Sequence, residues 1–254
     1  MLRCVVTVSK MGLGPAIYQR EIMSDYQRYA LYYAPSSQSA LGRFGDAWLG
    51  RNAETGNDIA RLAIDGLDGG EIVAATTSPV RYGFHGTLKP PFALKDGQTR
   101  SGLEVAINDL AVRLTPVRCG PLTLKAIGRF LALVPTEPVG ELGELAASLV
   151  RALDDFRKPE DEAAMNKRRA VGLTDRQESC LVQWGYPYVM EEFRFHLTLT
   201  NKLDAEQAQI FETALRPVVA PLCQDPFIVS DICLFGDPGE GKPFRFLKRF
   251  SFGG

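Results

Sequence analysis

Both histidines of this 254-residue chain lie in the same short pattern, which constrains the fold more than any other feature of the sequence. The stretch from Gly83 to Leu88 reads GFHGTL, and the stretch from Arg194 to Leu199 reads RFHLTL. Each stretch has a phenylalanine, the histidine, one variable residue, a threonine and a leucine in that order. Because the chain has no other histidine, this shared frame indicates an internal repeat.

The residues that follow each motif have the same order of predicted elements. After His85 the sequence predicts a strand ending at the Pro90-Pro91 break, a helix of about 99–114, and two strands, 120–128 and 129–135. After His196 it predicts a strand ending near residue 201, a helix of about 205–219, and two strands, 227–236 and 244–252. A duplicated α+β chain with two similar lobes is therefore expected.

The first residues differ in character from the rest of the chain. Their short apolar piece is interrupted by Lys10, which does not fit a signal peptide, and strand-like sequence begins soon after Met23, an alternative start. We therefore expect residues 1–23 to be a poorly integrated extension. Residues 24–254 are expected to form a single bilobal domain.

Side chains of a strand alternate between its two faces, so each motif has one apolar face and one polar face. The polar faces each carry an imidazole, a hydroxyl and a cation, and we expect them to face each other across a groove. Their members are His85, Thr87 and Lys89 in the first motif and Arg194, His196 and Thr198 in the second.

Such a groove suits phosphate-ester chemistry without a metal ion. A histidine titrates near neutral pH, so one imidazole can act as a base and the other as an acid. The hydroxyls can donate hydrogen bonds to phosphoryl oxygens, and cations can neutralise the phosphate, although a surface role is an equal alternative for each cation. The catalytic candidates are His85 and His196, and the phosphate-binding candidates are Thr87, Thr198, Arg81, Lys89 and Arg194.

Aromatic residues near the motifs could stack against a sugar or a base, with burial in the core as the alternative for most of them. The candidates are Tyr32, Trp184, Tyr186 and Tyr188. Tyr33 and Trp48 belong to the same group of aromatic residues, but the sequence does not distinguish stacking from burial for them.

The charge and the cysteines exclude several classes of function. A formal net charge of −1 argues against a protein that coats a polyanion. The 5 cysteines are scattered without C-x-x-C spacing, which favours reduced thiols in a cytoplasmic protein and disfavours a zinc site. No apolar run reaches the roughly 18 residues of a membrane helix, so we expect no membrane partner. We also expect no cofactor.

Several longer stretches carry a resemblance to a known family. The two motifs, with RYALYYAP, RFGDAWLGR, RYGFHGTLKPPF and WGYPYVMEEFRFHLTLT, resemble the 2H phosphoesterase superfamily, which includes RNA ligase-like and cyclic phosphodiesterase enzymes. Within it, the chain is most similar to a bacterial, DUF1045-like branch associated with phosphonate metabolism, over roughly residues 28–252. The resemblance implies a bilobal fold of two antiparallel sheets with helices outside and a central cleft. It also implies His85, Thr87, His196 and Thr198 as the catalytic set, with many small or apolar residues tolerated at the position of Gly86.

The sequence therefore predicts a phosphoric diester hydrolase of the cyclic phosphodiesterase type, acting on a small phosphate ester. The resemblance suggests a phosphorylated ribose cyclic phosphate. Two alternatives stay open: processing of 2′,3′-cyclic or 2′,5′-linked ends of short RNA, and a non-catalytic phosphate- or nucleotide-binding module. A histidine-ligated metal hydrolase is disfavoured because the sequence has no carboxylate cluster near the motifs. The substrate, the choice of base and acid, and the oligomeric state do not follow from the sequence.

Overall fold

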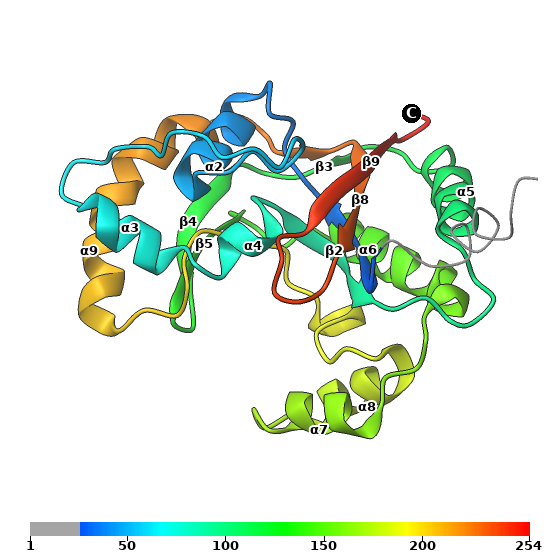
Figure 1. The fold of residues 1–254 in the computed structure, drawn as a ribbon. Coiled ribbons are helices and arrows are strands. Elements are labelled where there is room, and N and C mark those ends of the chain that lie inside the picture. The colour runs from blue at the N-terminus through cyan, green and yellow to red at the C-terminus, as the bar shows by residue number, and fades with distance from the viewer. Residues whose placement is uncertain (1–25) are drawn as a thin grey trace, which may run out of the picture.

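The computed structural model describes residues 26–254 as an α+β structure with antiparallel sheets (Figure 1), which confirms the predicted fold class. The expected extension, residues 1–23, lies outside the described residues. The strands are β1 (Arg28–Tyr33), β2 (Gly86–Phe92), β3 (Val117–Arg118), β4 (Leu122–Ile127), β5 (Phe130–Pro135), β6 (Leu197–Thr198), β7 (Ile228–Val229), β8 (Asp231–Asp237) and β9 (Arg245–Ser251).

The helices begin and end where the sequence supplies capping residues. Ser39 caps the start of α2 and Gly50 ends it in the left-handed conformation, and Thr174 with Gln177 forms a capping box at the start of α8. The helices are α2 (Ala40–Leu49), α3 (Gly69–Ala75), α4 (Pro79–Tyr82), α5 (Arg100–Ala111), α6 (Gly140–Ala152), α7 (Glu162–Arg169), α8 (Asp175–Trp184) and α9 (Ala205–Val219), with 3₁₀ turns at Asp154–Phe156, Met190–Glu192 and Ala220–Cys223.

Seven strands form the main sheet, in the order β4-β5-β6-β2-β1-β8-β9, and β3 pairs with β7 in a second, small sheet. The order of elements repeats along the chain: β2-α5-β3-β4-β5 is followed later by β6-α9-β7-β8-β9. The hairpins are exchanged between the repeats, because β4–β5 joins β6 and packs under α9, whereas β8–β9 joins β1 and packs against α5. The strands of both repeats thus share one sheet. The bilobal duplication itself stays a prediction.

Two motif strands differ in length from the expectation. The predicted break at Pro90-Pro91 is wrong, because β2 continues to Phe92 and pairs with β1 there; a register shift against β1 accommodates the prolines. In contrast, β6 contains only Leu197–Thr198, and beyond it the N–H groups of Leu199 and Thr200 both donate to the Leu131 carbonyl, so the regular ladder ends.

The two faces of the sheet differ in how they are covered. Buried residues of α2, α5, α6 and α9 form one large hydrophobic core with Tyr29 and Leu31 on one face of β1. The opposite face carries a smaller cluster that includes Tyr32, Phe235 and Phe244. In Figure 1, α2, α3 and α9 lie toward the left end of the molecule, α5 lies toward the right end, and α7 and α8 lie at the bottom. Within residues 26–254, no helix has the length and apolar character required to cross a membrane.

Candidate functional site

The two motif strands lie side by side, because β2 pairs with β6 in antiparallel fashion with Gly86 opposite Leu197. Opposite residues of an antiparallel pair share a face, and so do residues two apart along a strand. Continuing this register places His85 opposite Thr198, and Thr87 opposite His196. Cβ atoms of opposite residues are about 4.5–5.5 Å apart and those of diagonal neighbours about 7–8 Å. The two histidines and two threonines thus form one compact square on a single sheet, instead of facing each other from separate strands across a groove.

His85 is held in one orientation by its own backbone turn and by an aromatic ring. Its Nδ1 donates a hydrogen bond to the Gly83 carbonyl oxygen over 2.8 Å, and the Thr87 hydroxyl lies 3.3 Å from its Nε2. A carbonyl only accepts, so Nδ1 carries the proton and Nε2 is left as the acceptor in the neutral ring. The Tyr32 ring packs on the imidazole with centroids 3.9 Å apart, and Tyr82 lies 5.9 Å away.

This environment disfavours the protonated form of His85. Burial lowers the pKa of His85 to about 4; the bond to Gly83 opposes this shift, and the positive charge of nearby His196 adds to it. The side chain keeps partial contact with solvent, so a ligand can reach it. His85 is therefore a neutral imidazole at physiological pH, and its unprotonated Nε2 accepts from the Thr87 hydroxyl.

His196 repeats the same local arrangement on the neighbouring strand. Its Nδ1 donates to the carbonyl oxygen of Arg194, again two residues before the histidine, over 2.7 Å. Its ring packs beside Phe130 of β5, with centroids 5.6 Å apart. Each motif thus uses a carbonyl two residues upstream to fix the ring and to direct Nε2 away from the backbone.

Of the three candidate cations, Arg81 precedes His85 by four residues and is next to Tyr82 in the chain. It pairs with Asp237 at 3.3 Å, and its guanidinium lies over the rings of Tyr82 and Phe244 at 5.7 and 5.8 Å. Arg194 is exposed and donates to the carbonyls of Glu191 and Phe193. It therefore folds back onto its own loop.

Lys89 does not share the face of His85 and Thr87, contrary to the alternation expected from the sequence. The register between β1 and β2 shifts between Leu31 and Tyr32, so Lys89 lies opposite Leu31, on the core side. Its Nζ donates to the Val150 carbonyl of α6 over 3.1 Å, and only 2% of the residue is exposed. Burial lowers the pKa of Lys89 to about 8.

The aromatic candidates fall into different surroundings. Tyr32 is 1% exposed, so it supports His85 from below and offers no face to a ligand. Tyr186 is half-buried beside the guanidinium of Arg168, and Tyr188 is 43% exposed. Trp184 lines a narrow cavity of about 10 Å³ together with Tyr186 and is not brought to the histidines.

The two remaining aromatic residues are buried in the core. Trp48 is fully buried and donates its indole N–H to the Leu199 carbonyl, and Tyr33 packs on Phe195 and Phe227. Both therefore have structural roles.

Sequence reasoning missed several residues that lie at this site. Tyr82 and Phe130 pack beside the two imidazoles, and Arg28 joins Arg81 on Asp237. Tyr82 is three residues before His85, so nearness to the motif could have identified it. The other three come from distant strands, and no local pattern marks them.

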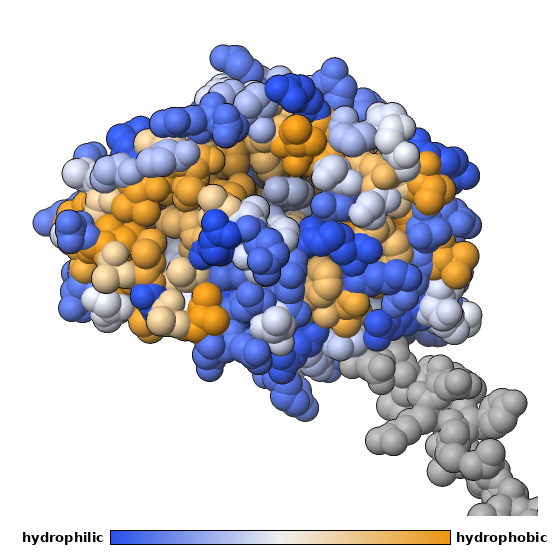
Figure 2. All heavy atoms as spheres, turned by 90° about the horizontal axis from the view of Figure 1, so that it is seen from above, coloured by the Kyte–Doolittle hydropathy of each residue, from blue (hydrophilic) through white to orange (hydrophobic). Residues whose placement is uncertain are grey.

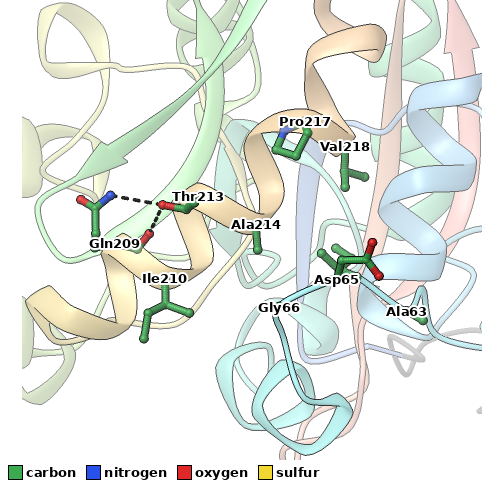
Figure 3. A pocket seen from close by; sticks show the side chains of 10 residues that line it. Ala63, Asp65, Gly66, Gln209, Ile210, Thr213, Ala214, Pro217 and Val218 are labelled. Atoms are coloured by element: carbon green, nitrogen blue, oxygen red, sulfur yellow. Dashed lines mark hydrogen bonds between the residues drawn. The ribbon is translucent and has the colours of Figure 1, made fainter.

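The square of histidines and threonines lies outside the walls of the three cavities described for residues 26–254. One cavity of about 1020 Å³ adjoins the second motif through Phe193 and Arg194. Another, of about 700 Å³, lies between α9 and the 63–66 loop (Figure 3), on the side where apolar side chains gather in Figure 2. All four motif side chains are partly exposed. Among the described residues, no group of three or more His, Cys, Asp and Glu side chains converges as a metal site would require.

Comparison with known proteins gives a family match and two kinds of relatives. Residues 87–245 match the family described as "Protein of unknown function (DUF1045)". The chain is 32% identical over 231 residues to ribose 1,5-bisphosphate phosphokinase PhnN of Janthinobacterium sp. (strain Marseille), covering 89% of this chain and 51% of that protein. It is 33% identical over 231 residues to the protein of the same name from Laribacter hongkongensis (strain HLHK9), covering 87% and 51%. The chain therefore spans about half the length of the curated relatives it matches.

Solved structures give weaker matches over almost the whole chain. A crystal structure of a phosphoesterase superposes with a TM-score of 0.41 and 12% identity, covering 89% of this chain and 98% of that one. E. coli LigT complexed with NADP+ superposes with a TM-score of 0.40 and 11% identity, covering 90% and 99%.

Proposed function

The chain belongs to the DUF1045 family, and on that premise we propose that it is a phosphoesterase that hydrolyses a small cyclic phosphodiester by histidine acid–base catalysis without a metal ion. One observation carries the proposal. The pairing of Gly86 with Leu197 brings both histidines and both threonines of the motifs onto one face of adjacent strands. Since the chain has only 2 histidines, this is the one place in residues 26–254 where two imidazoles could act on the same phosphate.

The surroundings of the two rings suggest their roles. His85 is neutral with Nε2 unprotonated, so it acts as the base that takes a proton from the attacking water. The water oxygen forms a bond to phosphorus as the ester P–O bond breaks. His196, whose Nδ1 donates to the Arg194 carbonyl, acts as the general acid in its protonated form and gives its Nε2 proton to the departing alkoxide.

The threonines would stabilise the charge that develops on the phosphate. Thr87 and Thr198 lie diagonally within the square, one beside each histidine of the opposite strand. Their hydroxyls donate hydrogen bonds to the two non-bridging oxygens of the phosphate in the transition state. When substrate is bound, the Thr87 hydroxyl turns from His85 Nε2 to the phosphate.

The name of the curated relatives supports a sugar phosphate as substrate. Those proteins are named for ribose 1,5-bisphosphate, which agrees with a phosphorylated ribose cyclic phosphate as the substrate of this chain. The phosphokinase part of that name is not carried over to this chain. The run from Gly236 to Lys242 has the spacing of a kinase phosphate loop, but it ends β8 and turns into β9, and Pro243 replaces the required Ser or Thr.

Processing of short RNA ends and ligand binding without turnover are the rival functions. Both would use the same square of side chains, so activity measurements must separate them. The expected cytoplasmic location and the independence from cofactors stay predictions.

The test is hydrolysis of a panel of cyclic phosphates by the purified chain. The panel contains ribose cyclic phosphates with and without a 5-phosphate, nucleoside 2′,3′-cyclic phosphates, and a short RNA with a 2′,3′-cyclic end. His85→Ala and His196→Ala should each lower the rate on the accepted substrate by about 10²–10⁴. Turnover of RNA ends alone would favour the rival enzyme. Binding of these compounds without any turnover would contradict the proposal.

A further inference from the structure

Two arginines converge on one buried carboxylate beside the candidate site. Arg28 donates to Asp237 Oδ2 from Nε over 3.0 Å and from Nη2 over 2.6 Å. Arg81 reaches both carboxylate oxygens of Asp237 from Nη2, over 3.3 and 3.4 Å. The Asp237 side chain is only 2% exposed, whereas those of Arg28 and Arg81 are 39% and 31% exposed. The carboxylate is therefore enclosed, and both guanidiniums reach the surface.

The charge at this place is not balanced. Burial acts to raise the pKa of Asp237, but hydrogen bonds from Arg28 and from the Gly239 N–H outweigh it and hold that pKa below its ordinary value. Asp237 is thus a full negative charge shared by two positive ones. Underneath, the 3% exposed Arg51 donates to the Phe244 carbonyl over 2.6 Å, and its Nε has no partner among the described residues.

Arg51 adds to this excess of positive charge. Its contacts at this place are carbonyl oxygens, and its only ionic neighbours among the described residues act at longer range. Three guanidiniums therefore surround the turn between β8 and β9, and one carboxylate bonds directly to two of them. Arg51 is buried, so the charge that reaches the surface comes from Arg28 and Arg81, which share the single carboxylate of Asp237.

This cluster lies on the same sheet face as the histidines and a short distance from them. Arg28 and Tyr32 are four residues apart on β1, so both point to one face with a separation of about 13 Å along the strand. The Tyr32 ring contacts His85 at one end, and its hydroxyl is close enough to Arg28 and Asp237 for their charges to act on its ionisation. Arg81 precedes His85 by four residues. The Tyr82 ring packs beside both the Arg81 guanidinium and the His85 imidazole.

We propose that Arg28 and Arg81 form a second anion subsite, which binds a phosphate group of the substrate that is not hydrolysed. The inference rests on the proposed function and specifies its substrate class as a sugar with a cyclic phosphate at one end and a phosphate monoester at the other. Guanidinium groups suit a monoester because each presents planar N–H donors to two phosphate oxygens. Asp237 is a positioning residue, because it fixes both guanidiniums before the ligand arrives and leaves one positive charge in excess.

The first experiment compares a ribose cyclic phosphate with the same compound bearing a 5-phosphate. The quantity measured is the ratio of the two kcat/KM values. In Arg28→Gln and Arg81→Gln the preference for the phosphorylated compound should fall about 10- to 100-fold, the usual effect of losing a charged hydrogen bond. Arg216→Gln, which removes an exposed arginine paired with Glu212 on α9, is the matched control and should keep the ratio. An unchanged ratio in both folded variants would overturn the subsite.

Conservative variants cover the case in which a glutamine variant does not fold. Arg28→Lys and Arg81→Lys keep the charge but lose the planar pair of donors, so the ratio should fall by about tenfold and less than in the glutamine variants. Thermal unfolding of each variant shows whether it is folded. Lysine variants with the ratio of the wild type would count against the geometry proposed here.

A binding measurement separates this inference from the proposed function. If the wild type hydrolyses neither compound, the proposed function fails, and calorimetric titration with ribose 5-phosphate and with ribose still tests the subsite. The wild type should bind the phosphorylated sugar and not ribose, and the variants of Arg28 and Arg81 should lose that difference. Equal binding of ribose 5-phosphate by the wild type and the variants would refute the subsite.

Discussion

Acidification should destabilise this fold through His85, by an amount that follows from its surroundings. The ring packs on Tyr32 and donates to Gly83, and burial lowers its pKa to about 4, whereas an unfolded histidine titrates near 6.5. Because the pKa of His85 is lower in the folded state, the contribution of the neutral ring to the free energy of unfolding is fully present above about pH 6.5. It is lost as the pH falls toward 4, since the unfolded chain binds a proton that the folded chain does not.

The size of the effect comes from the difference between the two pKa values. Between pH 7.5 and pH 4.5 the linkage relation gives a loss of about 2.5 kcal/mol in the free energy of unfolding from this one group. Carboxylates also titrate in that range, so the effect must be isolated by comparison. Over the same pH interval, the free energy of unfolding of His85→Gln should fall by about 2–3 kcal/mol less than that of the wild type. His196→Gln keeps His85, so its free energy of unfolding should fall nearly as much as that of the wild type.

Two measurements check this prediction. Urea unfolding at pH 7.5 and pH 4.5 gives the free energies, and imidazole NMR of the untagged chain gives the titration directly, because 2 histidines produce only two sets of ring signals. Each ring contributes one set of C–H signals, and the His196→Gln variant assigns the remaining set to His85. A His85 signal that titrates near 6.5, or equal pH dependence of the wild type and His85→Gln, would refute the reasoning from burial.

Other predictions concern the hydroxyls, the strand pairing and metal ions. Thr87→Val and Thr198→Val should each lower kcat by up to about 10²–10³ on the accepted substrate, whereas Thr213→Val on the exposed face of α9 should not; steady-state kinetics decides. Gly86→Ala should destabilise the fold by about 1–3 kcal/mol in urea unfolding, because its Cβ would lie 2.5 Å from the Phe195 ring; a variant as stable as the wild type would contradict that packing. Thorough treatment with a chelator should leave hydrolysis unchanged, and loss of activity restored by an added divalent ion would contradict metal-independent catalysis.

Local sequence signals predicted α5, α9 and most strands because those signals act within a few residues. The capping box of Thr174 with Gln177 at the start of α8 and Gly50 at the end of α2 are signals of the same short range. The closeness of the two motifs was also expected from the repeated pattern, but the sequence placed them across a groove, whereas the two motif strands pair in one sheet. The candidate site residues could therefore be named from the 2 histidines and their shared frame.

What the sequence did not reveal depends on contacts between distant residues or on irregular pairing. Strict alternation put Lys89 beside His85, but a register shift turns it into the core. Tyr32 was a candidate platform for a ligand, yet it is buried beneath the imidazole. Asp237 is 209 residues from Arg28, so no local pattern could connect them.

The exchange of hairpins between the repeats means that neither half of the chain can complete its part of the sheet alone. A backbone cut in the 157–173 connection would leave β6 and α9 on one fragment and their partners β4 and β5 on the other. Neither fragment should fold by itself, but the two should reassemble when mixed, because each supplies the strands that cover the other's exposed edges. For the same reason, neither repeat could be lost alone. Deletion of either repeat would remove one histidine and would also expose the core that supports the other.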